Sequence, residues 1–103
     1  MISQEKITQV IFNAIDDLNQ LLPRDRRLEK SQETVLSGPV GGLDSLGLIN
    51  LIVATEQKIQ EELNVAISLA DGKAMALPYN PFESIGTLAG YISVILKDKD
   101  HGK

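Results

Sequence analysis

The residue of this chain that is best placed to do chemistry is Ser45. It lies in the run Gly41-Gly42-Leu43-Asp44-Ser45-Leu46, between a glycine-rich loop and a strongly apolar segment. A serine at the start of a helix lies beside free backbone N–H groups and the positive end of the helix dipole, and both favour a phosphate group. The two glycines carry no side chains that would obstruct an approaching enzyme. This arrangement indicates a serine to which a group is attached.

Hydrolysis by Ser45 would require a general base, and the sequence offers none at a suitable spacing. His101 is the only histidine and lies near the C-terminus, and Lys58 lies about three and a half helical turns beyond Ser45. The Gly-x-Ser-x-Gly pattern of esterases is missing. The absence of cysteine excludes thiolate nucleophiles, thiolate metal sites and disulfides. We therefore predict a protein that is not an enzyme and holds no metal.

The size and composition indicate one small intracellular domain. The chain has 103 residues, of which 43% are hydrophobic, and this suffices for one core. Its formal net charge of −4 argues against nucleic acid as a partner. The sequence shows no secretory signal and no apolar stretch that could insert across a membrane. These features predict a cytoplasmic protein with one domain over residues 1–97 and a disordered, charged tail over residues 98–103.

The helical spacing of apolar residues predicts an all-α fold. The first helix is expected over residues 4–22, with Ser3 as its N-cap and Pro23 as its stop. A long loop over residues 23–43 leads to a second helix over residues 45–63, and an irregular connection follows. A short helical turn near Phe82 and Ile85 precedes a last helix, which Ser84 can cap. This order is typical of a small antiparallel four-helix bundle with three main helices and one short helix.

The second predicted helix is apolar on two sides. One stripe consists of Leu48, Ile52, Thr55 and Ile59, and the other consists of Leu46, Ile49 and Val53. The two stripes lie about a third of a turn apart around the helix. One of them must face the core, and the other either packs as well or binds a partner.

The chain resembles the acyl carrier protein family, whose members carry phosphopantetheine. The resemblance covers roughly residues 4–96. It lies in three groups of residues: Leu43-Asp44-Ser45-Leu46 at the head of the second helix, the later Leu51, Glu56, Glu61, Glu62 and Val65-Ala66-Ile67, and the closing run from Phe82 to Ile92. The order of the serine motif and its spacing from both flanking helices are fairly specific to that family.

The resemblance implies that Ser45 receives 4′-phosphopantetheine from coenzyme A through a holo-synthase. The thiol of this arm would then carry an acyl group as a thioester to the loading and using enzymes of a fatty-acid, modified-lipid or polyketide-type pathway. Partner recognition would fall to the motif residues and the helix that follows them: Asp44, Leu46, Ile49, Asn50, Val53 and Glu56. The interior could shelter the cargo between Leu51, Ile52, Ile59, Phe82 and Ile95, although these residues equally suit an ordinary core. We expect a monomer.

The chain also departs from the pattern of the fatty-acid carriers. Those proteins usually place acidic residues two and five positions after the modified serine, where this chain has Gly47 and Asn50. The predicted docking face is therefore less acidic and more apolar, and Glu56 is the first acidic residue after Ser45. We interpret this exposed charge as a contributor to partner encounter more than to folding. The departures favour a specialised carrier that serves a dedicated pathway.

Three alternatives stay open on the sequence. An aminoacyl or peptidyl carrier would use the same arm with a different cargo. An unmodified helical adaptor would use the stripe of Leu46, Ile49 and Val53 to bind a partner helix. In the simplest interpretation, Asp44 and Ser45 only cap the second helix, and Leu46 belongs to the core.

Overall fold

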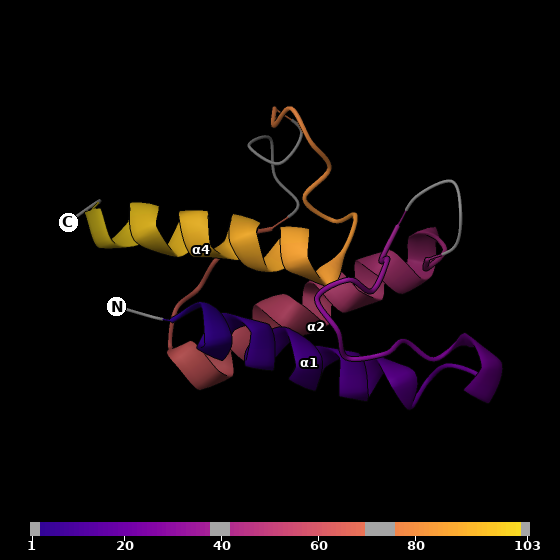
Figure 1. Cartoon of the computed structure of the whole chain (residues 1–103). Helices are drawn as coiled ribbons and strands as arrows, with labels where there is room; N and C mark the ends of the chain where they lie inside the picture. Colours follow the sequence, from indigo (N-terminus) through magenta and orange to yellow (C-terminus); the bar gives the residue numbers. More distant parts are fainter. Residues whose placement is uncertain (1–2, 38–41, 70–75, 102–103) are drawn as a thin grey trace.

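The computed structural model describes residues 3–37, 42–69 and 76–101 of the chain, with side chains through residue 97. These ranges contain three α-helices and one short 3₁₀ turn: α1 (Gln4–Asn19), η1 (Arg24–Arg26), α2 (Ser45–Leu63) and α4 (Ile85–His101). They contain no β-strand, and their single bridge pairs Val35 with Ser84. Helix α1 packs against both α2 and α4 and runs antiparallel to them (Figure 1). The all-helical prediction is thus confirmed for the described residues.

Helix α1 begins as predicted and ends earlier than predicted. The Ser3 hydroxyl accepts a hydrogen bond from the backbone N–H of Lys6 and caps the first turn. The helix stops at Asn19, because the next residues tighten into a turn in which Leu21 N–H donates to Leu18 O. Residue 22 also precedes a proline, which disfavours helical backbone there. The apolar face of α1 lies in the core, with Ile7, Val10, Ile11, Ala14, Ile15 and Leu18 buried.

Helix α2 has the predicted bounds. Asp44 caps its start, and Asn64 ends it in the left-handed conformation with φ 57°. Side-chain contacts fix its direction relative to α1: Lys58 pairs with Asp17 at 3.1 Å, and Glu62 accepts from Asn13 at 3.1 Å. The Asp17 carboxylate accepts a hydrogen bond from the ammonium group and raises the pKa of Lys58 above its ordinary value of 10.5.

Helix α4 begins with a reciprocal cap. The Ser84 hydroxyl accepts from the Thr87 backbone N–H at 3.2 Å, and the Thr87 hydroxyl accepts from the Ser84 backbone N–H at 2.9 Å. Ile85, Leu88, Tyr91 and Ile92 are buried in the core. The helix continues through residues 98–101, which we predicted to be a tail, because the first helix-breaking residue after Gly90 is Gly102. Residues 102 and 103 lie outside the described range.

The short helix predicted near Phe82 is not found within the described part of the chain. Residues 81–83 form a turn, and α4 starts at Ile85. The backbone here pairs with the long loop instead: Leu36 N–H donates to Glu83 O at 2.7 Å, and Ile85 N–H donates to Thr34 O at 3.1 Å. These bonds take up backbone groups that a short helix would use. Within the described ranges, no helix is long and apolar enough to cross a membrane.

Candidate functional site

Ser45 is the first residue of α2, and its side chain is exposed. The cap of the helix comes from Asp44, whose Oδ1 accepts from Gly47 N–H at 2.7 Å. The Ser45 hydroxyl makes no hydrogen bond with another described residue. In a helix that begins here, the N–H groups of Ser45 and Leu46 have no intrahelical acceptor. The helix therefore presents a free hydroxyl beside two free donors.

The backbone just before this serine is held in place by the long loop. Leu43 N–H donates to Leu36 O at 2.8 Å, and Leu36 is fully buried. Gly42 has φ +96°, and a Cβ on it would lie 2.9 Å from Leu36 O, so a side chain does not fit there. Gly41 lies outside the described residues. The sequence suggested an open approach at Gly42, and the structure adds that this glycine is required by the backbone itself.

An exposed apolar stripe continues from Ser45 along α2. Leu46 is 69% exposed, Ile49 55% and Val53 44%. Asn50 is exposed on the same turns of the helix. The other stripe faces inward, where Ile52, Thr55 and Ile59 are buried and Leu48 is half-buried. The interpretation that placed Leu46 in the core is therefore wrong, whereas Asp44 does cap the helix.

Glu56 differs from the exposed docking charge that we expected. It is half-buried, and its Oε2 accepts from the backbone N–H of Leu69 at 2.8 Å. Leu69 itself is fully buried. Glu56 thus ties the irregular connection after α2 to the helix. This contact could not be predicted from the sequence, because it joins residues across a connection without regular structure.

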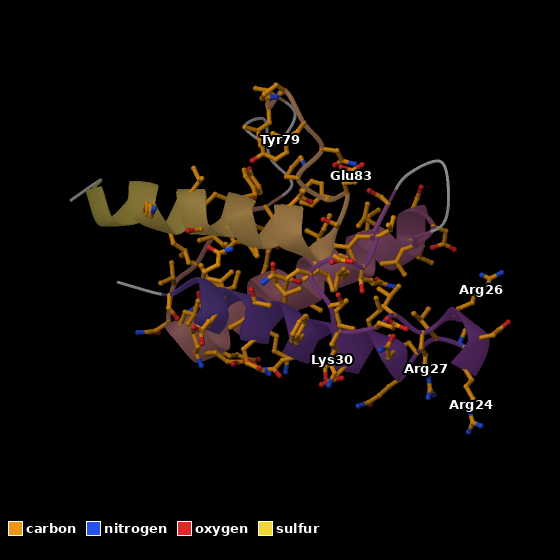
Figure 2. All side chains as sticks on the ribbon, in the orientation of Figure 1. Arg24, Arg26, Arg27, Lys30, Tyr79 and Glu83 are labelled. Atoms are coloured by element: carbon orange, nitrogen blue, oxygen red, sulfur yellow. The ribbon has the colours of Figure 1, made fainter. Side chains whose placement is uncertain are left out.

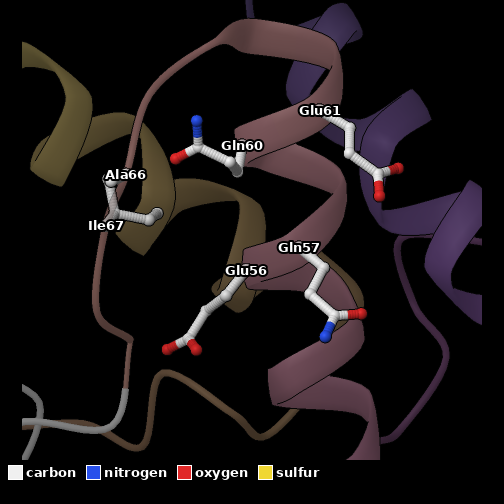
Figure 3. A pocket seen from close by; sticks show the side chains of 6 residues that line it. All are labelled: Glu56, Gln57, Gln60, Glu61, Ala66 and Ile67. Carbon is white, nitrogen blue, oxygen red and sulfur yellow. The ribbon is translucent and has the colours of Figure 1, made fainter.

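The described surface beyond Glu56 has a shallow groove along the distal half of α2. Glu56, Gln57, Gln60 and Glu61 line one side, and Ala66 and Ile67 line the other (Figure 3). The groove belongs to the half of α2 that lies away from Ser45. The residues proposed to shelter a cargo pack into the core: Leu51, Ile52 and Ile59 are buried, and Phe82 and Ile95 are half-buried against it.

Lys58 and His101, the two residues considered as a general base, belong to parts of the helices away from Ser45. Lys58 pairs with Asp17 on α1. Helix α4 carries the chain toward the end of the bundle where α1 begins, and α2 begins at the other end (Figure 1). Among the residues that the structure describes, no group of three or more His, Cys, Asp or Glu side chains could hold a metal ion.

Comparison of this chain with family models, with curated proteins and with solved structures finds no match.

Proposed function

We propose that the protein is a carrier of the acyl carrier type, with 4′-phosphopantetheine attached to the Ser45 hydroxyl. The observation that carries this proposal is that Asp44, and not Ser45, caps the start of α2. Asp44 provides the cap, which leaves the Ser45 hydroxyl exposed and without a hydrogen-bond partner among the described residues. A serine that only capped the helix would have its oxygen on a backbone N–H of the first turn.

The residues around Ser45 fit a phosphodiester. The exposed side chain leaves room for the group, and the free N–H groups at the start of α2 favour its negative charge. In the transfer, the Ser45 hydroxyl loses its proton to the modifying enzyme and forms an Oγ–P bond. The P–O bond of the coenzyme A pyrophosphate breaks, and adenosine 3′,5′-bisphosphate leaves. The attached arm would supply a thiol to carry cargo as a thioester, a group that this cysteine-free chain does not have.

Such a carrier would recognise its partner enzymes through the exposed stripe of Leu46, Ile49 and Val53. These side chains lie within the first three turns of α2, which begins at Ser45, and are available to a partner. The chain has no charged residue from Ser45 to Thr55, so the partner surface that covers the stripe should be apolar rather than basic. This supports a specialised carrier with dedicated partner enzymes.

The test is incubation with coenzyme A, Mg²⁺ and a broad-specificity phosphopantetheinyl transferase, followed by intact-mass measurement. We expect the mass to rise by one phosphopantetheine group. Ser45→Ala should abolish the addition, while Ser68→Ala, which alters another exposed serine, should not affect it. An unchanged mass of the wild-type chain, under conditions that load a known carrier, would reject the proposal.

The exposed stripe also supports the second candidate, an unmodified helical adaptor that binds an amphipathic partner helix. The adaptor predicts that Ser45 stays unmodified in the same assay. The nature of the cargo separates an acyl carrier from an aminoacyl or peptidyl carrier. Mass spectrometry of the loaded protein isolated from its host would identify that thioester.

A further inference from the structure

The segment that follows α1 is a structured tip that extends beyond the helix. The Asn19 side chain closes it from both sides: its Nδ2 donates to Leu28 O at 2.9 Å, and its Oδ1 accepts from Leu28 N–H at 2.8 Å. Within the closed segment, η1 begins after Pro23, and Arg26 N–H donates to Pro23 O at 2.9 Å. The backbone of the tip is therefore fixed by its own hydrogen bonds.

The tip displays three guanidinium groups and one large apolar side chain. We call Leu21, Arg24, Arg26 and Arg27 the cationic tip. Leu21 is 76% exposed, more than any other large hydrophobic residue that the structure describes. Arg24 and Arg26 form no ion pair or side-chain hydrogen bond with the described residues, and Arg27 Nε donates only to Leu22 O at 3.4 Å. The guanidinium groups of Arg24, Arg26 and Arg27 point outward in different directions (Figure 2).

The cationic tip itself is positive, with three arginines against one acidic residue, although the chain as a whole is negative. Lys30 is neutralised by Asp16 at 3.1 Å, and Asp25 is the only acidic residue inside the tip. Three further acidic residues, Glu29, Glu33 and Asp44, lie between the tip and α2 in the sequence, and their side chains are exposed. The tip and the start of α2 lie toward the same end of the bundle (Figure 1). That end thus combines the three arginines of the tip with the exposed apolar stripe of Leu46, Ile49 and Val53.

We propose that the cationic tip binds reversibly to the anionic headgroups of a lipid membrane, with Leu21 entering the interface. Exposed arginines beside an exposed apolar side chain are the features that attract a chain to an anionic bilayer surface. Guanidinium groups that point in several directions from a convex tip suit headgroups that can move laterally around them. An acidic patch on a protein, whose charges are fixed in place, would pair with fewer of the three guanidinium groups at once. The contact would bring Ser45 close to the membrane surface, but it does not depend on what Ser45 carries.

The experiment measures co-sedimentation of the full chain with phosphatidylcholine vesicles that contain or lack phosphatidylglycerol. We expect binding at low salt to the anionic vesicles alone, and weaker binding as salt rises. Arg24→Glu/Arg26→Glu should lower the partition coefficient about 25-fold or more, since each of the two basic residues at an anionic surface contributes roughly fivefold. Leu21→Ser should lower it as well.

The matched control is Lys6→Glu/Lys97→Glu, which makes the same change in net charge at exposed positions outside the tip. This variant should retain most of the binding. Equal loss in both double variants, equal binding to the two kinds of vesicle, or no binding at low salt would overturn the proposal. If the wild-type chain ignores the vesicles but binds immobilised polyglutamate through the same arginines, the partner is an acidic protein surface and the lipid assignment fails. None of these outcomes depends on loading of Ser45.

Discussion

Two neighbouring residues at the start of α2 have different tasks, and this separation is the basis of the proposed site. Asp44 satisfies the first turn of the helix through its 2.7 Å bond to Gly47 N–H. Ser45 is then free of a structural role, so its modification need not disturb the helix. Substituting an N-cap residue typically costs about 1 kcal/mol, and that cost should attach to Asp44 and not to Ser45.

Glu56 illustrates the opposite case, a charged residue whose role is structural. Its carboxylate satisfies the N–H of the buried Leu69, which would otherwise lack an acceptor. A buried backbone donor without a partner costs about 1–3 kcal/mol. We therefore expect Glu56→Lys to lower the free energy of unfolding by that amount, as measured by urea denaturation.

Glu56→Gln is the matched control for this prediction, because its side-chain oxygen can still accept the bond. It should retain most of the stability. If Glu56→Lys and Glu56→Gln unfold at the same urea concentration, the contact with Leu69 contributes nothing, and Glu56 returns to the set of docking charges that the sequence suggested.

At the scale of elements, α2 has two apolar stripes, of which one is buried and the other is exposed. The stripe of Ile52, Thr55 and Ile59 is buried against α1 and the core, whereas Leu46, Ile49 and Val53 remain exposed. Burial of a second stripe would require another helix on that side. Among the described residues, none covers it. The exposed stripe therefore has no role in holding the described helices together.

We expect Val53→Lys to slow the loading of Ser45 by its modifying enzyme, with a loss of about tenfold in kcat/KM, because the substitution places a charge in an apolar contact. Stability should change by no more than about 0.5 kcal/mol, since the site is exposed. The measurement pairs loading kinetics with thermal unfolding.

Val94→Lys is the control for this experiment, because Val94 on α4 is the same type of residue and is also exposed (53% against 44% for Val53). It should load at the wild-type rate. Equal loading of the Val53→Lys and Val94→Lys variants would show that the exposed stripe of α2 is not part of the contact with the enzyme.

The bounds of the helices could be predicted where local signals set them. Asp44 and Asn64 delimit α2 by capping, and Ser3 starts α1 in the same way. The end of α1 was predicted three residues too late, because the turn after Asn19 accompanies side-chain bonds from Asn19 to the Leu28 backbone, which form only when the segment after the helix folds back. The exposure of Leu46 could be expected from the family resemblance alone, because the periodicity could not choose between the two stripes. Both stripes of α2 are apolar, and only the packing of the other helices decides which is buried.

At the scale of the whole molecule, the long loop and α4 are joined through their backbones. Gly86 N–H donates to Gln32 O at 2.8 Å, and Leu36 N–H donates to Glu83 O at 2.7 Å. The Ser37 hydroxyl adds a bond to Phe82 O at 2.8 Å. Because Leu43 N–H in turn donates to Leu36 O, the backbone before Ser45 is connected to the start of α4. The position of the candidate site thus depends on a contact between segments far apart in the sequence.

Two glycines of α4 test this connection. A Cβ on Gly86 would lie 3.1 Å from Gln32 O, whereas a Cβ on Gly90 would meet nothing within 4 Å. We expect Gly86→Ala to lower the free energy of unfolding by about 1 kcal/mol or more, because the loop must move away. Gly90→Ala should raise it by about 0.5–1 kcal/mol, since alanine favours helix over glycine. Chemical denaturation of both variants provides the measurement, and equal stabilisation would mean that the loop yields at no cost.

The direction of the helices has a practical consequence for handling the protein. Helix α1 begins and α4 finishes at one extremity of the bundle, whereas α2, whose first residue is Ser45, begins toward the other (Figure 1). An affinity tag, a fluorophore or a sensor chip coupled to either terminus would leave the serine facing the solution. Immobilised chains should therefore be modified at the same rate as free ones, and a fused neighbouring domain would not need to be removed before the loading assay.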